Sequence, residues 1–265
     1  MIRMEKIQCG YGPKIVLDDI DLEVKKDEFV GIIGPNGSGK TTVLRAITRL
    51  IKPMRGKIYL DNKDIYTLSH KEIAQEIAVV SQNLPIVSMT VKEFILLGRV
   101  PYYKNLQFFE SEHDLIAANR AMTMTNIEHL KNHYMSEMSG GEVQLAFIAR
   151  AIAQEPSLLL LDEPTAHLDI THQVSVLDLI KRLNRQHDLT VIIVLHDLNL
   201  ASEYCDKVVL MDNGKIQKVG APEEVLTYKD IEEVYHTVVV VEKNPLSGKP
   251  FVLVVSEEVK ERCEK

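Results

Sequence analysis

The stretch "EFVGIIGPNGSGKTTVLRAITRLI", residues 28–51, decides the fold. The residues that follow its first glutamate, 29–33, form an apolar run that is typical of a buried strand. Its last part, residues 41–51, spaces apolar side chains as one face of a helix does. The glycine-rich segment between them, residues 34–42, matches the pattern G-x-x-x-x-G-K-[ST]. Strand, glycine-rich loop and helix in this order predict a phosphate-binding loop.

The residues of this loop have separate chemical tasks. Gly34 and Gly39 permit a tight turn whose backbone N–H groups converge on a phosphate. Lys40 places a positive charge beside the β- and γ-phosphates, and the Thr41 hydroxyl is suited to Mg²⁺. A glycine turn with an incidental lysine is the alternative, and the strand before and helix after it disfavour that. The predicted nucleotide-binding residues are Gly34, Pro35, Asn36, Gly37, Ser38, Gly39, Lys40, Thr41 and Thr42.

Strand and helix patterns alternate along the rest of the chain. The stretches "EIAVVSQ", "SLLLLDEP" and "LTVIIVLHD" contain apolar runs, which are typical of a parallel sheet covered on both faces. A mostly helical segment interrupts the alternation. We therefore predict an α/β fold with a mostly parallel sheet. Its core comprises 1–82 and 155–220, its inserted helical subdomain 83–154, and its C-terminal extension 221–265.

Two hairpins are expected towards the C-terminal end. Residues 207–220 read as two strands with Asn-Gly between them, which is a strong hairpin signal. A second, smaller hairpin is expected around residues 245–250. Both would add antiparallel strands to a fold that is otherwise of the parallel type.

Several predicted strands end in reactive side chains. One is followed by Asp162 and Glu163, and another by His196. Ligands bind at the carboxyl ends of the strands in open α/β sheets, so these groups are expected along one edge with the phosphate loop. Asp162 would hold Mg²⁺, Glu163 would act as the base towards a water, and His196 would bond the γ-phosphate. Taken alone, the acid pair could be a helix cap and the histidine structural.

The stretch "EMSGGEVQLAFIARAI", residues 137–152, places two glycines before an apolar run. Ser139 and Glu142 have capping-box spacing, which predicts a helix start. A capping box needs no glycine, and each glycine in a helix costs about 1 kcal/mol against alanine. A bare helix start that offers N–H groups to a phosphate is the second reading of Gly140 and Gly141.

Composition excludes several classes of protein. The chain has 265 residues, 45% of them hydrophobic, and a net charge of −7, which argues against general nucleic-acid binding. No apolar run reaches the 18 or so residues of a membrane span, and the first residues lack a secretion signal. Three scattered cysteines fit neither a disulfide framework nor a zinc site.

Together these motifs resemble the nucleotide-binding subunit of an ABC transporter. The resemblance implies a RecA-like P-loop NTPase core, an antiparallel β part at the N-terminal end, ATP and Mg²⁺. It also implies a head-to-tail homodimer, in which Ser139, Gly140 and Gly141 bind the γ-phosphate of the ATP held by the partner copy. One copy of each motif per chain agrees with a dimer.

Further residues match the family by position. Tyr11 resembles the aromatic that stacks on adenine, Gln82 the glutamine that reaches Mg²⁺ and the water, and Asp169 the aspartate that crosses the dimer interface. Met138 and Glu142 depart from the usual leucine and glutamine. A carboxylate near phosphate is repulsive unless it turns back to Ser139, so we expect only a mild effect on rate.

A narrower resemblance points to importers of iron–siderophore, haem or cobalamin. It rests on "TVKEFILLGRVPY", "VLHDLNLASEYCDKVVLMDNGKI" and "EEVYHTVVVV". It implies that residues 83–110 form a groove for a helix of a membrane permease. A peripheral position on the cytoplasmic face of the membrane and an extracytoplasmic solute-binding protein are also implied, and no nucleic-acid partner.

Other readings stay open at this point. A molybdate- or tungstate-type importer shares much of the pattern, and an exporter subunit is disfavoured only weakly. A soluble ABC ATPase in DNA repair or translation usually carries two motif sets or long coiled-coil insertions, neither of which is seen here. An ordinary P-loop kinase would have no use for residues 139–141.

Overall fold

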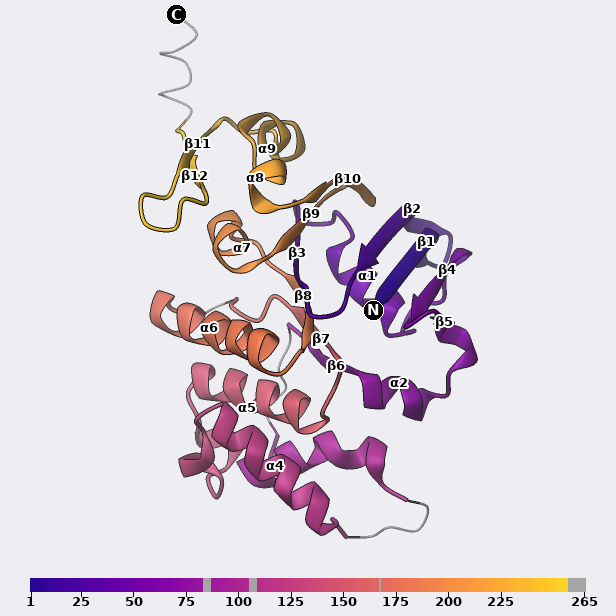
Figure 1. Ribbon diagram of the computed structural model, residues 1–265, viewed down its shortest axis with the longest axis vertical. Coiled ribbons are helices and arrows are strands. Elements are labelled where there is room, and N and C mark those ends of the chain that lie inside the picture. Colours follow the sequence, from indigo (N-terminus) through magenta and orange to yellow (C-terminus); the bar gives the residue numbers. More distant parts are fainter. Residues whose placement is uncertain (83–86, 105–108, 167, 257–265) are drawn as a thin grey trace, which may run out of the picture. The chain divides into compact units, whose positions relative to one another are not determined.

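The computed structural model describes residues 1–82, 87–104, 109–166 and 168–256 (Figure 1). The chain divides into two compact units, which we call unit 1 (Met1–Asn62 and Ile192–Lys265) and unit 2 (Lys63–Val191). Among the described residues, no helix combines the length and the apolar character needed to cross a bilayer.

Unit 1 opens with an antiparallel sheet. Strand β1 (Ile2–Tyr11) pairs with β2 (Lys14–Val24) on one side and with β4 (Arg55–Leu60) on the other. Alternate side chains of β1 are buried, as expected for a strand with one face on a core. This confirms the expected antiparallel part at the N-terminal end.

The parallel strands of unit 1 are built on β3 (Phe29–Ile33), whose five residues are all buried. Strand β9 (Lys207–Asp212) runs parallel to β3 and is followed by the antiparallel β10 (Lys215–Gly220). The turn between β9 and β10 uses Asn213 and Gly214, with φ of 45° and 76°, as a tight hairpin requires. The Leu195 amide, just after β8 (Thr190–Val194), donates to the Ile32 carbonyl.

Helix α1 (Lys40–Ile47) is shorter than the helix predicted over 41–51. The chain leaves the helix because Arg49 adopts a left-handed conformation with φ of 61°. The remaining elements of unit 1 confirm the second hairpin and add helices to it. They are α7 (Leu198–Tyr204), α8 (Pro222–Val225), α9 (Tyr228–Tyr235), β11 (Val239–Lys243) and β12 (Pro250–Val254).

Unit 2 holds two parallel strands and most of the helices. Strand β6 (Ile77–Val80) runs parallel to β7 (Leu158–Asp162), and β7 is buried throughout. The Thr190 amide at the start of β8 donates to the Ser157 carbonyl before β7. The other regular elements are β5 (Lys63–Asp64), α2 (His70–Glu76), α3 (Val91–Leu96), α4 (Glu112–Met124), α5 (Gly140–Ala153) and α6 (Ile170–Gln186).

Helices α3, α4 and α5 pack around a buried arginine. The Arg99 guanidinium is fully buried and bonds Asp114 of α4 at 3.1 Å and Glu155, just after α5, at 2.7 Å. It also donates to the carbonyl of Ala153 at 2.6 Å. A buried charge needs such partners, so this cluster fixes α4 against the end of α5. The helical insertion expected from the sequence is confirmed, while the domain boundaries at 82, 154 and 220 stay predictions.

Candidate functional site

The phosphate loop of unit 1 requires glycine at both ends. Gly34 leaves β3 with φ of 148°, and a Cβ there would lie 2.1 Å from the Met211 carbonyl oxygen. Gly39 has φ of 102°, and a Cβ there would lie 2.6 Å from a methyl of Leu17. The Met211 carbonyl leaves no room for a Cβ at Gly34, and the φ of Gly39 is one that other residues rarely adopt. The sequence motif therefore reflects a loop held tightly between β2, β9 and α1.

The polar groups of the loop suit a phosphate. Lys40 is buried, and its Nζ donates to the carbonyl oxygens of Gly34 and Pro35, each at 2.9 Å. Ser38 Oγ is buried without a hydrogen-bond partner among the described residues. Within the described chain no side chain caps α1, whose N-cap is Gly39. The N–H groups of a helix start, a buried ammonium group and a buried hydroxyl are the kinds of donor that bind a phosphate group.

Tyr11 lies at the end of β1 and is 45% exposed. Its hydroxyl accepts a hydrogen bond of 2.6 Å from Arg45 of α1. The Arg45 guanidinium also lies 5.9 Å from the centre of the ring. Arg45 thus orients a ring that remains accessible to a planar base, as its predicted role requires.

His196 follows β8 in unit 1 and is exposed. The preceding residue, Leu195, is bonded to Ile32, which stands two positions before Gly34. His196 is therefore held by the strand pairing next to the strand that feeds the phosphate loop. Its predicted bond to the γ-phosphate stays a prediction.

Tyr235 of α9 is a neighbour of the loop that the sequence did not reveal. Burial raises the pKa of Tyr235 to about 12, an effect that the nearby backbone N–H of Gly34 opposes. The hydroxyl is enclosed, yet it forms no regular hydrogen bond within the described residues. A tyrosine in a C-terminal segment carries no recognisable motif, so only the fold could place it there.

Unit 2 brings two of the predicted catalytic residues into contact. Strands β6 and β7 are parallel, and the residues that follow them meet: Gln82 Nε2 donates to Glu163 Oε2 at 2.5 Å. Glu163 has φ of 52°, a conformation that is costly for a residue other than glycine, asparagine or aspartate. Asp162, at the end of β7, is only 8% exposed. Such strain at a strand end is typical of functional sites.

The start of α5 confirms the capping box. The Ser139 amide donates to the Glu142 carboxylate at 2.8 Å and the Ser139 hydroxyl at 2.7 Å. These bonds from Ser139, with the nearby His129 and His133, hold the pKa of Glu142 below its usual range. The carboxylate is therefore turned back to Ser139, which is the geometry expected if it is not to repel a phosphate.

The two glycines of α5 have different surroundings. At Gly140 a Cβ would meet no atom of the described residues within 4 Å, its own helix aside. At Gly141 it would lie 2.5 Å from Cδ2 of His172 in α6. Gly140 therefore keeps an open surface at the helix start, whereas Gly141 makes room for His172. Nothing in the sequence pattern indicates this second reason for a glycine.

His172 also holds Asp169. Its ring Nδ1 lies 2.9 Å from both carboxylate oxygens of Asp169, and its backbone N–H donates to the same group at 2.9 Å. These bonds from His172 lower the pKa of Asp169. Within unit 2, His172 thus links the predicted interface aspartate to Gly141, one of the residues predicted to bind the partner's γ-phosphate.

The predicted residues fall in both units. Tyr11, residues 34–42 and His196 belong to unit 1. Unit 2 contains the other predicted site residues, which are Gln82, Ser139, Gly140, Gly141, Asp162, Glu163 and Asp169. The contacts of these side chains show where each of them lies within its unit, and their roles in binding and catalysis stay predictions.

Comparisons with known proteins give the family. The family model described as "ABC transporter" matches residues 17–166. The ferric enterobactin transport ATP-binding protein FepC of Escherichia coli (strain K12) is 38% identical over 95% of this chain and 93% of its own length.

Solved structures show the same fold. A structure presented as a metal-chelate type ABC transporter in an inward-facing conformation aligns with a TM-score of 0.85 and 25% identity, over 97% of this chain and 98% of that one. The dimeric ABC transporter cassette MJ0796 aligns with a TM-score of 0.73 and 30% identity, over 84% of this chain and 99% of its own. With its phosphate loop, the start of α5 at residues 139–141 and these matches, the chain belongs to the ABC transporter family.

Proposed function

We propose that this chain is the ATP-hydrolysing subunit of an importer that takes up a metal chelate, such as an iron–siderophore, haem or cobalamin. Two similar proteins support this cargo class, the ferric enterobactin transport protein FepC and the metal-chelate type transporter described above. The observation that carries the catalytic part is the hydrogen bond between Gln82 and Glu163, at the ends of the parallel strands β6 and β7. It provides a carboxylate of fixed orientation next to the aspartate of β7.

ATP is the substrate, and the loop of residues 34–42 binds its phosphates. Lys40 exchanges its carbonyl contacts for the β- and γ-phosphates, while Tyr11 stacks on the adenine. When bound, Mg²⁺ neutralises charge on the phosphates, and Thr41, Asp162 and Gln82 would hold it.

Glu163 receives the proton of the attacking water, since its carboxylate follows the end of β7 and is held there by Gln82. Gln82 orients that carboxylate, and His196 donates to the γ-phosphate.

The active form is a head-to-tail homodimer. Ser139 and Gly140 are exposed at the start of α5, and the open surface at Gly140 accepts the γ-phosphate held by the partner copy. Asp169, held by His172, lies at the interface between the copies. The dimeric state of the similar cassette MJ0796 agrees with this arrangement.

A cavity of about 380 Å³ near α3 suits a helix of the permease. It includes the exposed Leu97, and an apolar helix face with a basic flank would complement its two glutamates. The segments 83–86 and 105–108 of the expected groove lie outside the described residues. The residues that line the cavity are Ser88, Met89, Glu93, Leu96, Leu97, Tyr103 and Glu110.

This docking makes the chain a peripheral protein on the cytoplasmic face of the membrane. The permease carries the cargo path, and an extracytoplasmic solute-binding protein delivers the cargo to it. Movement of the helical subdomain, residues 83–154, transmits the state of the nucleotide to the permease.

The Glu163→Gln variant tests the catalytic assignment. Loss of a general base lowers kcat by about 10²- to 10⁴-fold, whereas ATP binding should persist. Glu233→Gln on α9 is the matched control, because Glu233 is exposed and lies outside the site. Equal hydrolysis rates for the two variants would contradict the assignment. For the cargo, a strain without the gene should lose uptake of a radiolabelled ferric siderophore, and the Glu163→Gln gene should not restore it.

A further inference from the structure

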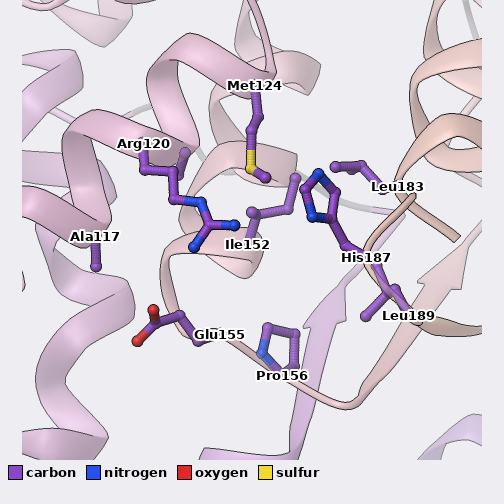
Figure 2. A pocket seen from close by; sticks show the side chains of 10 residues that line it. Ala117, Arg120, Met124, Ile152, Glu155, Pro156, Leu183, His187 and Leu189 are labelled. Carbon is purple, nitrogen blue, oxygen red and sulfur yellow. The ribbon is translucent and has the colours of Figure 1, made fainter.

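A second cavity of unit 2 has no role in the proposed reaction. It measures about 240 Å³ and lies between α4, the end of α5 and the end of α6 (Figure 2). It includes Pro156, just before β7, whereas the predicted catalytic residues follow the other end of that strand. Its lining residues are Ala117, Arg120, Ala121, Met124, Ile152, Glu155, Pro156, Leu183, His187 and Leu189.

The walls of this cavity are largely apolar. Leu183 and Leu189 are buried, and Ile152 and Met124 are largely covered. Figure 2 shows the thioether of Met124 and the side chain of Ile152 between two polar groups, the Arg120 guanidinium and the His187 ring. An apolar interior with a few placed polar groups is the usual character of a small-molecule site.

The polar groups at the rim favour an anion. Arg120 forms no hydrogen bond or ion pair with any residue in the described ranges, and neither does the His187 ring. Glu155 is the acid of the lining, and its carboxylate is bound by the Arg99 guanidinium at 2.7 Å. A guanidinium that lacks a protein partner at an apolar cavity is suited to a carboxylate.

We propose that this cavity is a binding site for a small organic monoanion with an apolar body. Arg120 binds the carboxylate, and the apolar body lies against Ile152 and Met124 and reaches the His187 ring. The volume exceeds the roughly 150 Å³ of a cavity that accepts benzene and falls short of the roughly 300 Å³ at which drug-sized sites begin. The ligand therefore carries one ring or a short chain.

The same ligand would slow ATP hydrolysis, an effect that rests on the proposed function. It would join Arg120 of α4, in the predicted helical subdomain, to His187 after α6, in the predicted core. The elements that meet here carry predicted site residues at their other ends: α5 begins at Gly140, and α6 follows Asp169. A ligand that binds the predicted helical subdomain and the predicted core together opposes movement of the subdomain against the core.

The binding test uses 3-phenylpropionate on the full-length chain, read by NMR of ¹³C-methyl methionine. The Met124 signal, identified by its loss in Met124→Leu, should shift in a saturable way, with or without ATP and Mg²⁺. The neutral analogue 3-phenyl-1-propanol should bind at least about tenfold more weakly. Arg120→Gln should weaken binding of the acid about tenfold, which is 1.4 kcal/mol, and leave the alcohol unchanged. Arg185→Gln, an exposed residue of α6 outside the lining, is the matched control.

Three results would overturn the site. They are an unmoved Met124 signal, equal affinity for the acid and the alcohol, and equal affinity of Arg120→Gln and Arg185→Gln for the acid. Ala117→Leu, which fills the cavity, should also abolish the shift. Binding without slower hydrolysis would overturn the inhibition. A chain that binds 3-phenylpropionate but never hydrolyses ATP would overturn the proposed function and leave the site intact.

Discussion

Gly140→Ala and Gly141→Ala form a matched pair of substitutions with opposite expected effects. Both replace glycine in the first turn of α5, so both gain the same helix propensity, at most about 1 kcal/mol. The Gly140 methyl enters open space, while the Gly141 methyl meets Cδ2 of His172 at 2.5 Å. Overpacking costs about 1–3 kcal/mol in a closed core, and because the His172 side chain is 50% exposed and can shift, we expect the low end of that range, about 1 kcal/mol. Because the propensity term cancels, Gly141→Ala should be less stable than Gly140→Ala by that amount.

The assay is unfolding in guanidinium chloride, followed by circular dichroism, on the two variants and their His172→Ala double variants. His172→Ala removes the clashing ring, so the difference between the two alanine variants should shrink to near zero. The rate of ATP hydrolysis should show the reverse order. Gly140→Ala, the more stable variant, should hydrolyse ATP more slowly than Gly141→Ala, because its methyl covers the surface proposed for the partner's phosphate. Equal stability of the two single variants would refute the packing argument. Full activity of Gly140→Ala would refute the proposed role of that surface.

Three further predictions follow from other contacts. Arg99→Met should destabilise the chain by about 3–5 kcal/mol, since it leaves the buried Asp114 without its charged partner. The control Arg185→Met, at an exposed position, should change the unfolding free energy in the same denaturant assay by less than about 0.5 kcal/mol. The capping box makes the pKa of Glu142 lower in the folded chain than in the unfolded one, so the stability that its carboxylate contributes is present above the unfolded pKa and is lost as pH falls through the folded pKa. The difference in unfolding free energy between wild type and Glu142→Ala should therefore shrink on acidification, and a difference independent of pH would contradict this. Tyr235 should titrate at about pH 12 when the ultraviolet absorbance of the tyrosines is followed, and Tyr235→Phe should remove that step. The substitution should cost little stability, because the hydroxyl has no regular partner in the described residues. A destabilisation above about 2 kcal/mol would show that the hydroxyl is bonded.

The elements that carry chemistry were predictable because their signals are local. The loop at Gly34 needs glycine for steric reasons that a pattern records, and the capping box of Ser139 and Glu142 is a spacing. The hairpin at Asn213 likewise follows from the turn that asparagine and glycine allow. Apolar runs such as that of β7 predict buried strands, since a strand covered on both faces has no polar side.

The parts that escaped prediction depend on contacts between distant residues. Nothing in the sequence near Gly141 reveals His172, and Tyr235 meets the phosphate loop only through the fold. Helix α1 ends at Ile47 although its apolar pattern continues to Ile51, because Arg49 turns left-handed. Short helices such as α2 and α7, each of seven residues, are too brief for periodicity to reveal.

The most direct test of the central claim, that two copies share their ATP sites, is the mass in solution of Glu163→Gln with and without ATP and Mg²⁺. We expect a monomer without ATP and a dimer with ATP, because bound nucleotide persists when the base is removed. Adding Gly140→Leu, which covers the open surface at the start of α5, should return the protein to a monomer at the same ATP concentration. A monomeric chain that hydrolyses ATP at full rate, with or without Gly140→Leu, would contradict the account.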